Sequence, residues 1–278
     1  MTDWVALAEP TVERIERARR DGRADDAAAL ARQLVDDAQE IHDLLADWAR
    51  RLPELLGEAP PPLEAFERGW AAFVAGCSGF GPDTDLDALV ATWRAAHDHA
   101  LDRVATLVDR WVDRHGEARL GELWRELQRD GIAFYRGAYG PDRPWAESFD
   151  RLLRVAIDGM HGHLGGPRGR GEVAVAVHDD RVSLTFAPCG SGGRVLDGGS
   201  HGVVVGAHDF AWSTPGVCRY CVHCCVLQQQ GAIDLHGYPA RVIDPPTEPG
   251  APCTWTVYRD PALVPDSAYE RVGRSRRG

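Results

Sequence analysis

Apolar side chains recur every three or four residues through the first 165 positions of the chain. One stripe runs through Leu30, Leu34, Ala38, Ile41, Leu45, Trp48 and Leu52. A second alternates steps of four and three through Leu86, Val90, Trp93, His97, Ala100, Val104, Leu107 and Trp111. This spacing lines one face of an α-helix with apolar groups, and the regular alternation is typical of a helix-bundle seam. The sequence therefore predicts two long helices.

Shorter stripes extend the helical pattern. They occur at Leu120, Leu123, Leu127 and Phe134, and again at Trp145, Phe149, Leu152, Ala156 and Met160. Prolines at positions 60–62 separate the two long helices, because proline cannot continue a helix. We expect residues 1–165 to form an antiparallel helix bundle.

Beyond the glycines at 165 and 166 the pattern becomes strand-like. Residues 171–177 and 181–186 alternate apolar and polar side chains, and the residues between them predict a hairpin. Residues 203–205 and 254–258 are further strand candidates, because they are rich in β-branched and aromatic side chains. The predicted fold class is α+β. A helical domain spans residues 1–165, and a Cys/His-rich α+β domain with a small antiparallel sheet spans residues 166–278.

Cysteines concentrate in this second region. Of the seven in the chain, four lie within residues 218–225, too close together for independent disulfides. The Cys-x-x-Cys spacing of Cys218 and Cys221 aims two thiolates at one point, Cys224 repeats that spacing, and His223 adds an imidazole. The candidate metal ligands are Cys189, Cys218, Cys221, His223, Cys224 and Cys225.

A complete metal site needs a ligand from elsewhere, because steric limits keep one short segment from placing five donors around one ion. Cys189 is the preferred distant ligand, since glycines follow it and their backbone can fold over the sulfur; Cys253 competes with it. Zinc suits mixed Cys/His ligands, whereas the repeated two-residue gaps also suit an iron–sulfur cluster. The alternative is that these cysteines are small buried apolar side chains.

A zinc site is catalytic when one coordination position stays open, and structural when it is closed. The Gly-rich loop over residues 190–193 can offer successive backbone amides to an anion, and Arg194 adds a positive charge suited to a carboxylate. A tight hairpin turn explains the same glycines equally well. The loop favours catalysis, with Arg194 and His223 as the catalytic candidates.

Three of the histidines in the helical region are candidates for a functional role. His97 is on the second seam, where a satisfied core histidine is more typical than a ligand or a base. His161 and His163 follow the last stripe, where a positive charge would favourably oppose the dipole at the helix end.

Charge narrows the set of partners. The net charge is −11, from 42 acidic and 31 basic side chains, and no basic cluster precedes the arginines of the last eight residues. Nucleic acid and anionic membranes are therefore poor partners. The N-terminal segment lacks the apolar core of a signal peptide, and no apolar run is long enough to span a bilayer. We expect a cytoplasmic protein with a small-molecule ligand.

The segment Gly250-Ala-Pro-Cys-Thr-Trp-Thr-Val-Tyr258 places a cysteine at the start of a strand near the end of the chain. It resembles the C-terminus of the L-2-amino-thiazoline-4-carboxylic acid hydrolase family and of related small-ligand domains of the vinyl-reductase type. The resemblance covers the last third of the chain. It implies an α+β domain that engages a small molecule through a cysteine.

These features predict a zinc-dependent enzyme, a hydrolase or lyase, that acts on a small carboxylated or thiol-bearing molecule. In this hypothesis the metal is held by Cys189, Cys221 and Cys224, with His223 or Cys218 completing or flanking the shell. The first alternative is a non-enzymatic binding or sensing protein with a structural zinc site. The second is an iron–sulfur redox protein.

Overall fold

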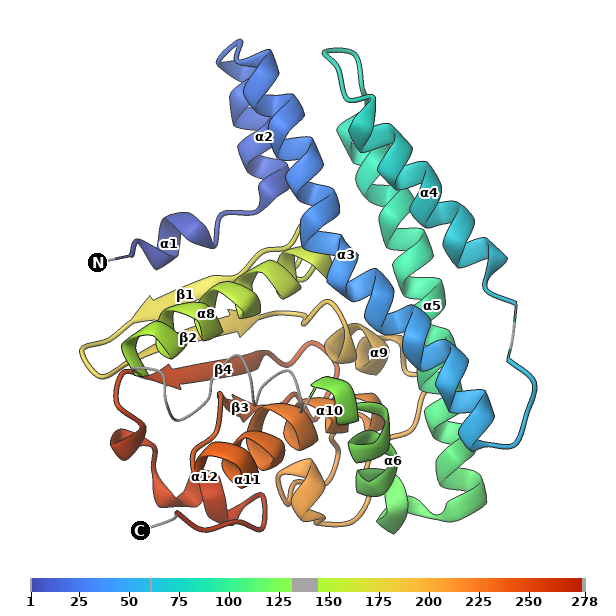
Figure 1. Ribbon diagram of the computed structural model, residues 1–278, viewed down its shortest axis with the longest axis vertical. Coiled ribbons are helices and arrows are strands. Elements are labelled where there is room, and N and C mark those ends of the chain that lie inside the picture. The colour runs from blue at the N-terminus through green and yellow to red at the C-terminus, as the bar shows by residue number, and fades with distance from the viewer. Residues whose placement is uncertain (1, 61, 132–144, 277–278) are drawn as a thin grey trace.

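The protein is an α+β protein, as the sequence predicts (Figure 1). The computed structural model describes residues 2–60, 62–131 and 145–276. Long helices make up most of the N-terminal part, and a four-stranded antiparallel sheet with short helices follows.

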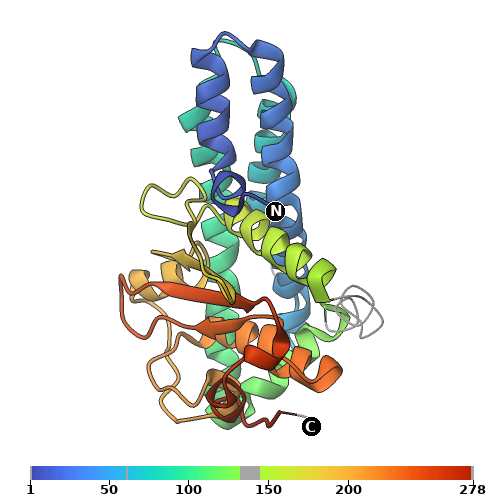
Figure 2. The ribbon, with the colours of Figure 1, turned by 90° about the vertical axis from the view of Figure 1, so that its left-hand side faces the viewer.

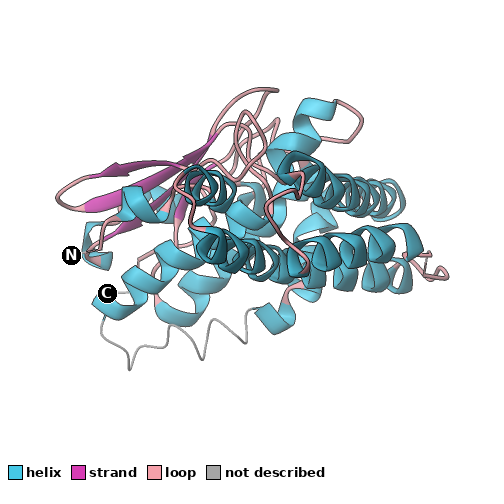
Figure 3. Ribbon diagram, turned by 90° about the horizontal axis from the view of Figure 1, so that it is seen from above, coloured by secondary structure: helices cyan, strands magenta, loops and turns pink. Residues whose placement is uncertain are grey.

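Four helices, α2 (Thr11–Arg20), α3 (Ala24–Leu55), α4 (Glu64–Ser78) and α5 (Leu86–His115), form a column that rises above the mixed region, and α3 and α5 continue down beside it (Figure 2). The short α1 (Trp4–Leu7) lies at the foot of this column. Helices α2 to α5 alternate in direction, and α3 packs on α2, α4 and α5. Seen end-on, the long helices lie beside one another while the strands occupy the opposite side of the molecule (Figure 3).

The two long predicted helices are confirmed as α3 and α5. All eight positions of the second seam are buried within α5, including His97, which has no exposed surface. Helix α5 begins at a capping residue, Asp85, whose carboxylate accepts a hydrogen bond of 3.0 Å from the Ala88 amide. The shorter stripes become α6 (Leu120–Leu127) and α8 (Trp145–Gly162), whereas the stripe position Phe134 lies outside the described residues.

Helix α8 connects the two parts of the fold. It packs against α3 on one side and against the sheet on the other. Its last residue, Gly162, lies so close to α3 that an added Cβ would be 2.1 Å from the carbonyl oxygen of Asp37. A glycine is therefore needed where the two backbones meet.

The sheet has the order β1-β2-β4-β3, and every neighbouring pair is antiparallel. Its strands are β1 (Ala174–Val177), β2 (Arg181–Phe186), β3 (Val242–Asp244) and β4 (Cys253–Tyr258). The predicted hairpin and the predicted strand at residues 254–258 are confirmed, while β3 was not predicted. In the β2–β4 register Phe186 pairs with Cys253.

The strand predicted at residues 203–205 is wrong. Only Val203 makes a β-bridge, to Cys218. Val204 exchanges backbone hydrogen bonds of 2.8 Å with Val217 and Gly216, but the amides of Val205 and Gly206 donate hydrogen bonds of 2.8 Å to the carboxylate of Glu117, so the backbone pairing does not continue. This segment is a loop that is hydrogen-bonded to Glu117 of the helical part.

Short helical segments fill the rest of the C-terminal part. They are α9 (Gly192–Gly198), η2 (Asp209–Ala211), η3 (Arg219–Cys221), α10 (Val222–Cys224), the π-helical η4 (Cys225–Gly231), α11 (Ala232–His236), η5 (Pro261–Leu263) and α12 (Asp266–Glu270). The rings of Trp48, Trp124 and Tyr220 pack together across the predicted boundary near residue 165. The architecture changes there, but both parts share one continuous core.

Candidate functional site

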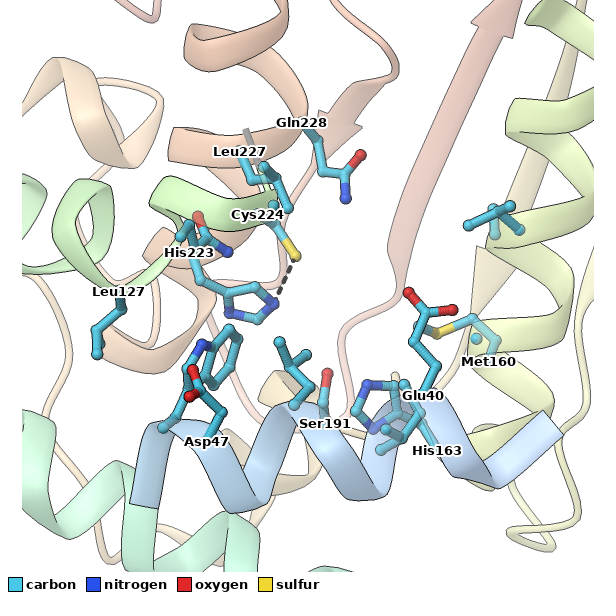
Figure 4. A pocket seen from close by; sticks show the side chains of 18 of the residues that line it. Glu40, Asp47, Leu127, Met160, His163, Ser191, His223, Cys224, Leu227 and Gln228 are labelled. Carbon is cyan, nitrogen blue, oxygen red and sulfur yellow. Dashed lines mark hydrogen bonds between the residues drawn. The ribbon is translucent and has the colours of Figure 1, made fainter. Parts of the chain in front are cut away.

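A cavity of about 460 Å³ lies where α3, α6, α8 and the segment from η3 to η4 meet (Figure 4). Its walls are mainly apolar, from Ile41, Leu44, Trp48, Leu127, Val155, Ala156, Met160, Leu227 and Trp255. Its polar lining comes from Glu40, Asp47, Arg51, Gln128, Asp130, His163, Ser191, His223, Cys224, Gln228 and Arg241. An apolar cavity of this size with a few convergent polar groups is typical of a small-molecule site.

His223 and Cys224 form a hydrogen-bonded pair in the wall of this cavity. The Nδ1 atom of His223 lies 2.7 Å from the carbonyl oxygen of Tyr220, and its Nε2 atom lies 3.2 Å from the sulfur of Cys224. A carbonyl oxygen can only accept, so Nδ1 carries the proton and the neutral ring presents the lone pair of Nε2 to the thiol. The backbone therefore fixes the tautomer that can accept the proton of Cys224.

Aromatic rings hold the imidazole of His223 in this orientation. Its ring centroid lies 4.8 Å from that of Tyr220, 5.2 Å from that of Trp48 and 5.4 Å from that of Trp124. These three rings come from η3, α3 and α6. The helical part thus supplies most of the packing around the ring.

Burial keeps the pair neutral. It lowers the pKa of His223 to about 4, although the hydrogen bond to Tyr220 acts in the opposite direction. It also raises the pKa of the Cys224 thiol. At neutral pH the resting state is therefore a thiol that donates to an uncharged imidazole, because separated charges are poorly solvated here.

A second, much smaller void of about 10 Å³ lies beside the pair. Cys189, Cys221, Cys224, Cys253 and His223 contribute to its lining. Its volume is close to that of one water molecule. The structure thus brings together three of the predicted cysteine ligands, the predicted imidazole and the competing distant ligand.

Close backbone packing shapes this group of cysteines. An added Cβ on Gly192 would lie 2.1 Å from the sulfur of Cys221, so a glycine folds over a cysteine sulfur, although over Cys221 rather than Cys189. The Cys189 sulfur lies 3.4 Å from the Ser191 hydroxyl. Cys218 and Cys221 share a hydrogen bond, which lowers the pKa of Cys218 and raises that of Cys221.

Cys225 lies away from both cavities. Its thiol contacts the carbonyl oxygen of Asp209 at 3.5 Å. Across the described residues, no three His, Cys, Asp or Glu side chains converge in a geometry that would hold a metal ion. The zinc site and the iron–sulfur alternative stay predictions.

Arg194 lies elsewhere than the sequence predicts, whereas the Gly-rich loop does lie beside the cysteines. Arg194 lines neither of these two cavities; it donates to the carboxylate of Asp98 and, at 2.8 Å, to the carbonyl oxygen of Leu164. The glycines are not a hairpin turn, because Gly192 and Gly193 begin α9. Ser191 of this loop lines both cavities, and Gly192 and Gly193 line the smaller one, while the anion-binding role of the loop stays a prediction.

Sequence reasoning missed several residues of the cavity. His163 follows α8 and lines the cavity opposite His223, with Ser191 between them in Figure 4. The sequence did contain a hint of this residue, because His163 stands at the end of one predicted helix and His97 lies on the apolar seam of another. Gln228 and Arg241 carried no comparable signal.

Comparison of the chain with known protein families, with curated proteins and with solved structures finds no match. Among the helices in the described ranges, none combines the length and the apolar character needed to cross a bilayer. The functional argument therefore rests on the geometry of the cavity.

Proposed function

We propose that this protein is an enzyme that uses Cys224 as a nucleophile toward a small molecule bound in the 460 Å³ cavity. The observation that carries this proposal is the 3.2 Å contact between the Cys224 sulfur and His223 Nε2, in a ring whose Nδ1 is anchored on Tyr220. A nucleophile, a base within hydrogen-bond reach and a group that orients the base are the three parts of a covalent catalytic site.

The first chemical step transfers one proton and forms one bond. The thiol proton of Cys224 moves to His223 Nε2 while the sulfur attacks an electrophilic carbonyl carbon, and the carbonyl π electrons move to its oxygen. When the adduct collapses, the bond to the leaving group breaks and the leaving group takes the proton from His223. A thioester on Cys224 remains, which water then hydrolyses.

The Tyr220 carbonyl supports this step because it accepts from Nδ1 throughout and stabilises the imidazolium that forms transiently. Burial opposes a standing ion pair, so proton transfer accompanies attack rather than preceding it. The free thiol is thereby kept unreactive until a substrate is bound.

The cavity lining favours a compact, mainly apolar organic molecule. Arg241, only 1% exposed, adds a positive charge to the lining, held by a 2.6 Å bond to the Leu152 carbonyl and by packing 5.1 Å over the Trp255 ring. Arg241 also donates to the side-chain oxygen of Gln228, and Glu40, Asp47 and Asp130 bring negative charge to the same lining, so the charges of the cavity do not select a carboxylate.

Metal binding is a second candidate function, supported by the small void that four cysteines and His223 line. The candidate ligands for zinc there are Cys189, Cys221, His223, Cys224 and Cys253. A zinc ion would supply Lewis-acid chemistry to the same cavity.

The test uses p-nitrophenyl acetate as an acylating probe. We expect a burst of about one equivalent of nitrophenolate per chain, with the acetyl group on Cys224 by peptide mass spectrometry. Cys224→Ala abolishes the burst, and His223→Gln slows it about 100-fold. The matched control is Cys225→Ala, which removes the neighbouring thiol that faces Asp209 and keeps the burst.

Two results would contradict the proposal. One is an undiminished burst in Cys224→Ala, and the other is equal acetylation of several cysteines. Removal of metal by a chelator leaves the burst unchanged if Cys224 is the nucleophile. A stoichiometric metal whose loss abolishes the activity, and whose return restores it, would favour the metal-dependent alternative.

A further inference from the structure

A chain of three side chains connects the cavity with the outer surface of α5. Asp98 Oδ1 lies 2.8 Å from His97 Nδ1, and His97 Nε2 lies 2.8 Å from His163 Nδ1. The two imidazoles are 0% and 5% exposed, whereas the Asp98 side chain is 38% exposed. Asp98 borders a surface hollow of about 160 Å³, and His163 lines the cavity that contains Cys224.

The distances fix where the protons lie. A carboxylate can only accept, so His97 Nδ1 carries a proton that it donates to Asp98. The neutral His97 ring then presents a lone pair at Nε2 and accepts from His163 Nδ1. By the same rule, His163 has its lone pair at Nε2, an atom with no hydrogen-bond partner in the described part of the chain.

Arg194 reinforces this order of donors and acceptors. It donates to Asp98 and to the Leu164 carbonyl, so one guanidinium fixes both the carboxylate and the backbone next to His163. Its 3.4 Å approach to His97 Nδ1 is long beside the 2.8 Å contact of Asp98, which therefore takes the Nδ1 proton. Arg194 thus acts on the cavity through Asp98 and His97.

The backbone around His163 is held equally firmly. The Trp93 indole donates a 2.8 Å hydrogen bond to the Gly162 carbonyl. Gly190 packs so close to the His163 carbonyl that an added Cβ would lie 2.3 Å from its oxygen. Leu164 has a φ of +51°, in the left-handed region that non-glycine residues rarely adopt. Such constraints keep the ring in one place relative to the cavity.

Electrostatics keep both rings neutral and Asp98 ionised. Burial lowers the pKa of His97 and that of His163. Burial alone would raise the pKa of Asp98, but the hydrogen bond from His97 and the charge of Arg194 lower it. Three other charged or titratable groups face the chain of Asp98, His97 and His163. They are Arg94 on α5, Glu40 on α3 and His223 on α10.

We propose that His163 Nε2 is a proton acceptor facing the bound molecule, and that His97 and Asp98 relay the accepted proton to the surface. In the enzyme proposed above, on which this step rests, water attacks the thioester carbon and gives a proton to His163 Nε2. The proton of His163 Nδ1 passes to His97 Nε2, and that of His97 Nδ1 passes to Asp98 and solvent. The carbon–sulfur bond breaks, and the acid product returns its proton to Cys224 through His223.

The relay also restricts the ligand. The group nearest His163 must offer an O–H or N–H, because Nε2 presents a lone pair. Water, a hydroxyl or an amide fits this end of the cavity, whereas a second acceptor would be repelled.

The first experiment needs no substrate and reads the resting state of the wild-type protein directly. Two-bond proton–nitrogen NMR spectra of ¹⁵N-labelled protein report which nitrogen of each histidine carries hydrogen. We expect both His97 and His163 to be protonated at Nδ1, with a scalar coupling between His97 Nε2 and His163 Nδ1. Spectra of His97→Gln and His163→Gln assign the signals. A proton on His163 Nε2 overturns the proposal.

The second experiment follows hydrolysis of the acetylated enzyme formed by p-nitrophenyl acetate. His163→Gln keeps the burst but slows deacylation about 100-fold, and Asp98→Asn slows it about tenfold. The matched control is Asp102→Asn, one turn along α5, where the carboxylate contacts His201 instead. Unchanged deacylation in His163→Gln overturns the relay. A wild-type chain without a burst contradicts Cys224 as nucleophile, and the NMR result then decides the relay alone.

Discussion

The helical column and the C-terminal part are held together by different interactions. In helices α2 to α5 nearly every backbone group bonds within its own helix, and the core consists of apolar stripes. Between β2 and the end of α12 short helices and strands alternate with irregular backbone, whose amides and carbonyls depend on buried polar side chains for partners. The first arrangement tolerates the loss of single polar groups, whereas the second depends on them.

Gln229 shows this dependence most clearly. It is fully buried and makes three hydrogen bonds, from the Trp212 indole, from the Ile243 amide at 3.0 Å and to the Ala268 carbonyl at 3.3 Å. One side chain therefore connects η4 with a loop, with β3 and with α12.

Replacing this glutamine gives the largest expected effect. Gln229→Leu leaves three buried polar groups without partners, each costing about 1–3 kcal/mol, so we expect a loss of about 4 kcal/mol in the free energy of unfolding. Urea denaturation monitored by tryptophan fluorescence measures it. The matched control is Gln39→Leu on α3, where the amide contacts only Asp43 at the surface; a change below about 0.5 kcal/mol is expected. Equal losses in both variants would remove the contrast between the two parts.

The contact between α3 and α8 tests how tightly the two parts are joined. Gly162→Ala places a methyl group 2.1 Å from the Asp37 carbonyl, so the helices must separate, at a cost of about 3 kcal/mol. Gly159→Ala on the same helix meets nothing within 4 Å and should stabilise the protein by about 0.5–1 kcal/mol. Thermal unfolding followed by circular dichroism compares them. If Gly162→Ala leaves the unfolding temperature unchanged, the interface between α3 and α8 accommodates a methyl group and the prediction is wrong.

The smallest effect concerns a buried charge in the helical column. Burial raises the pKa of Asp37 to about 6, so the folded state holds a proton there that the unfolded chain releases near pH 3.8. Stability therefore falls as pH rises from about 4 to 6, by up to about 3 kcal/mol for a shift of about two pKa units.

Asp37→Asn removes this dependence. It keeps an acceptor for the Thr11 hydroxyl, which lies 2.7 Å from the carboxylate. We expect a gain of about 2 kcal/mol above pH 7 and none below pH 4, measured by urea unfolding across pH. Asp25→Asn, at an exposed position near the start of the same helix, serves as the control and should leave the pH profile unchanged. A gain that is the same at every pH would contradict the role of ionisation.

The long helices were predictable because their signal is local and repeated. Each apolar residue of the α5 seam lies on the same face of the helix, so the periodic pattern would remain visible after any single substitution. The hairpin of β1 and β2 was predictable for the same reason. The loop at residues 203–205 was not, because Glu117, about ninety positions away, takes the hydrogen bonds that a strand would have used.

The candidate site was predictable only in part. Residues 218–225 concentrate chemically active side chains, and that alone located one wall of the cavity. The opposite wall depends on His163 meeting His97, which is 66 positions away along the chain. A single sequence carries no trace of that pairing. Arg194 was singled out for its charge, but its hydrogen bonds join it to Asp98 instead of the cavity.

The π-helical segment η4 (Cys225–Gly231) makes the fold sensitive to the length of the chain at this point. A π-turn closes with one residue more than an α-turn. That extra residue sets the rotation by which Gln228 reaches the cavity, Gln229 the core and Gln230 the Val272 carbonyl. Deleting one residue here would convert the segment into an α-helix. Each later side chain would then be rotated about the helix axis by the angle that separates two successive residues. A single deletion, without any substitution, would thus change which side chains line the cavity and which are buried in the core.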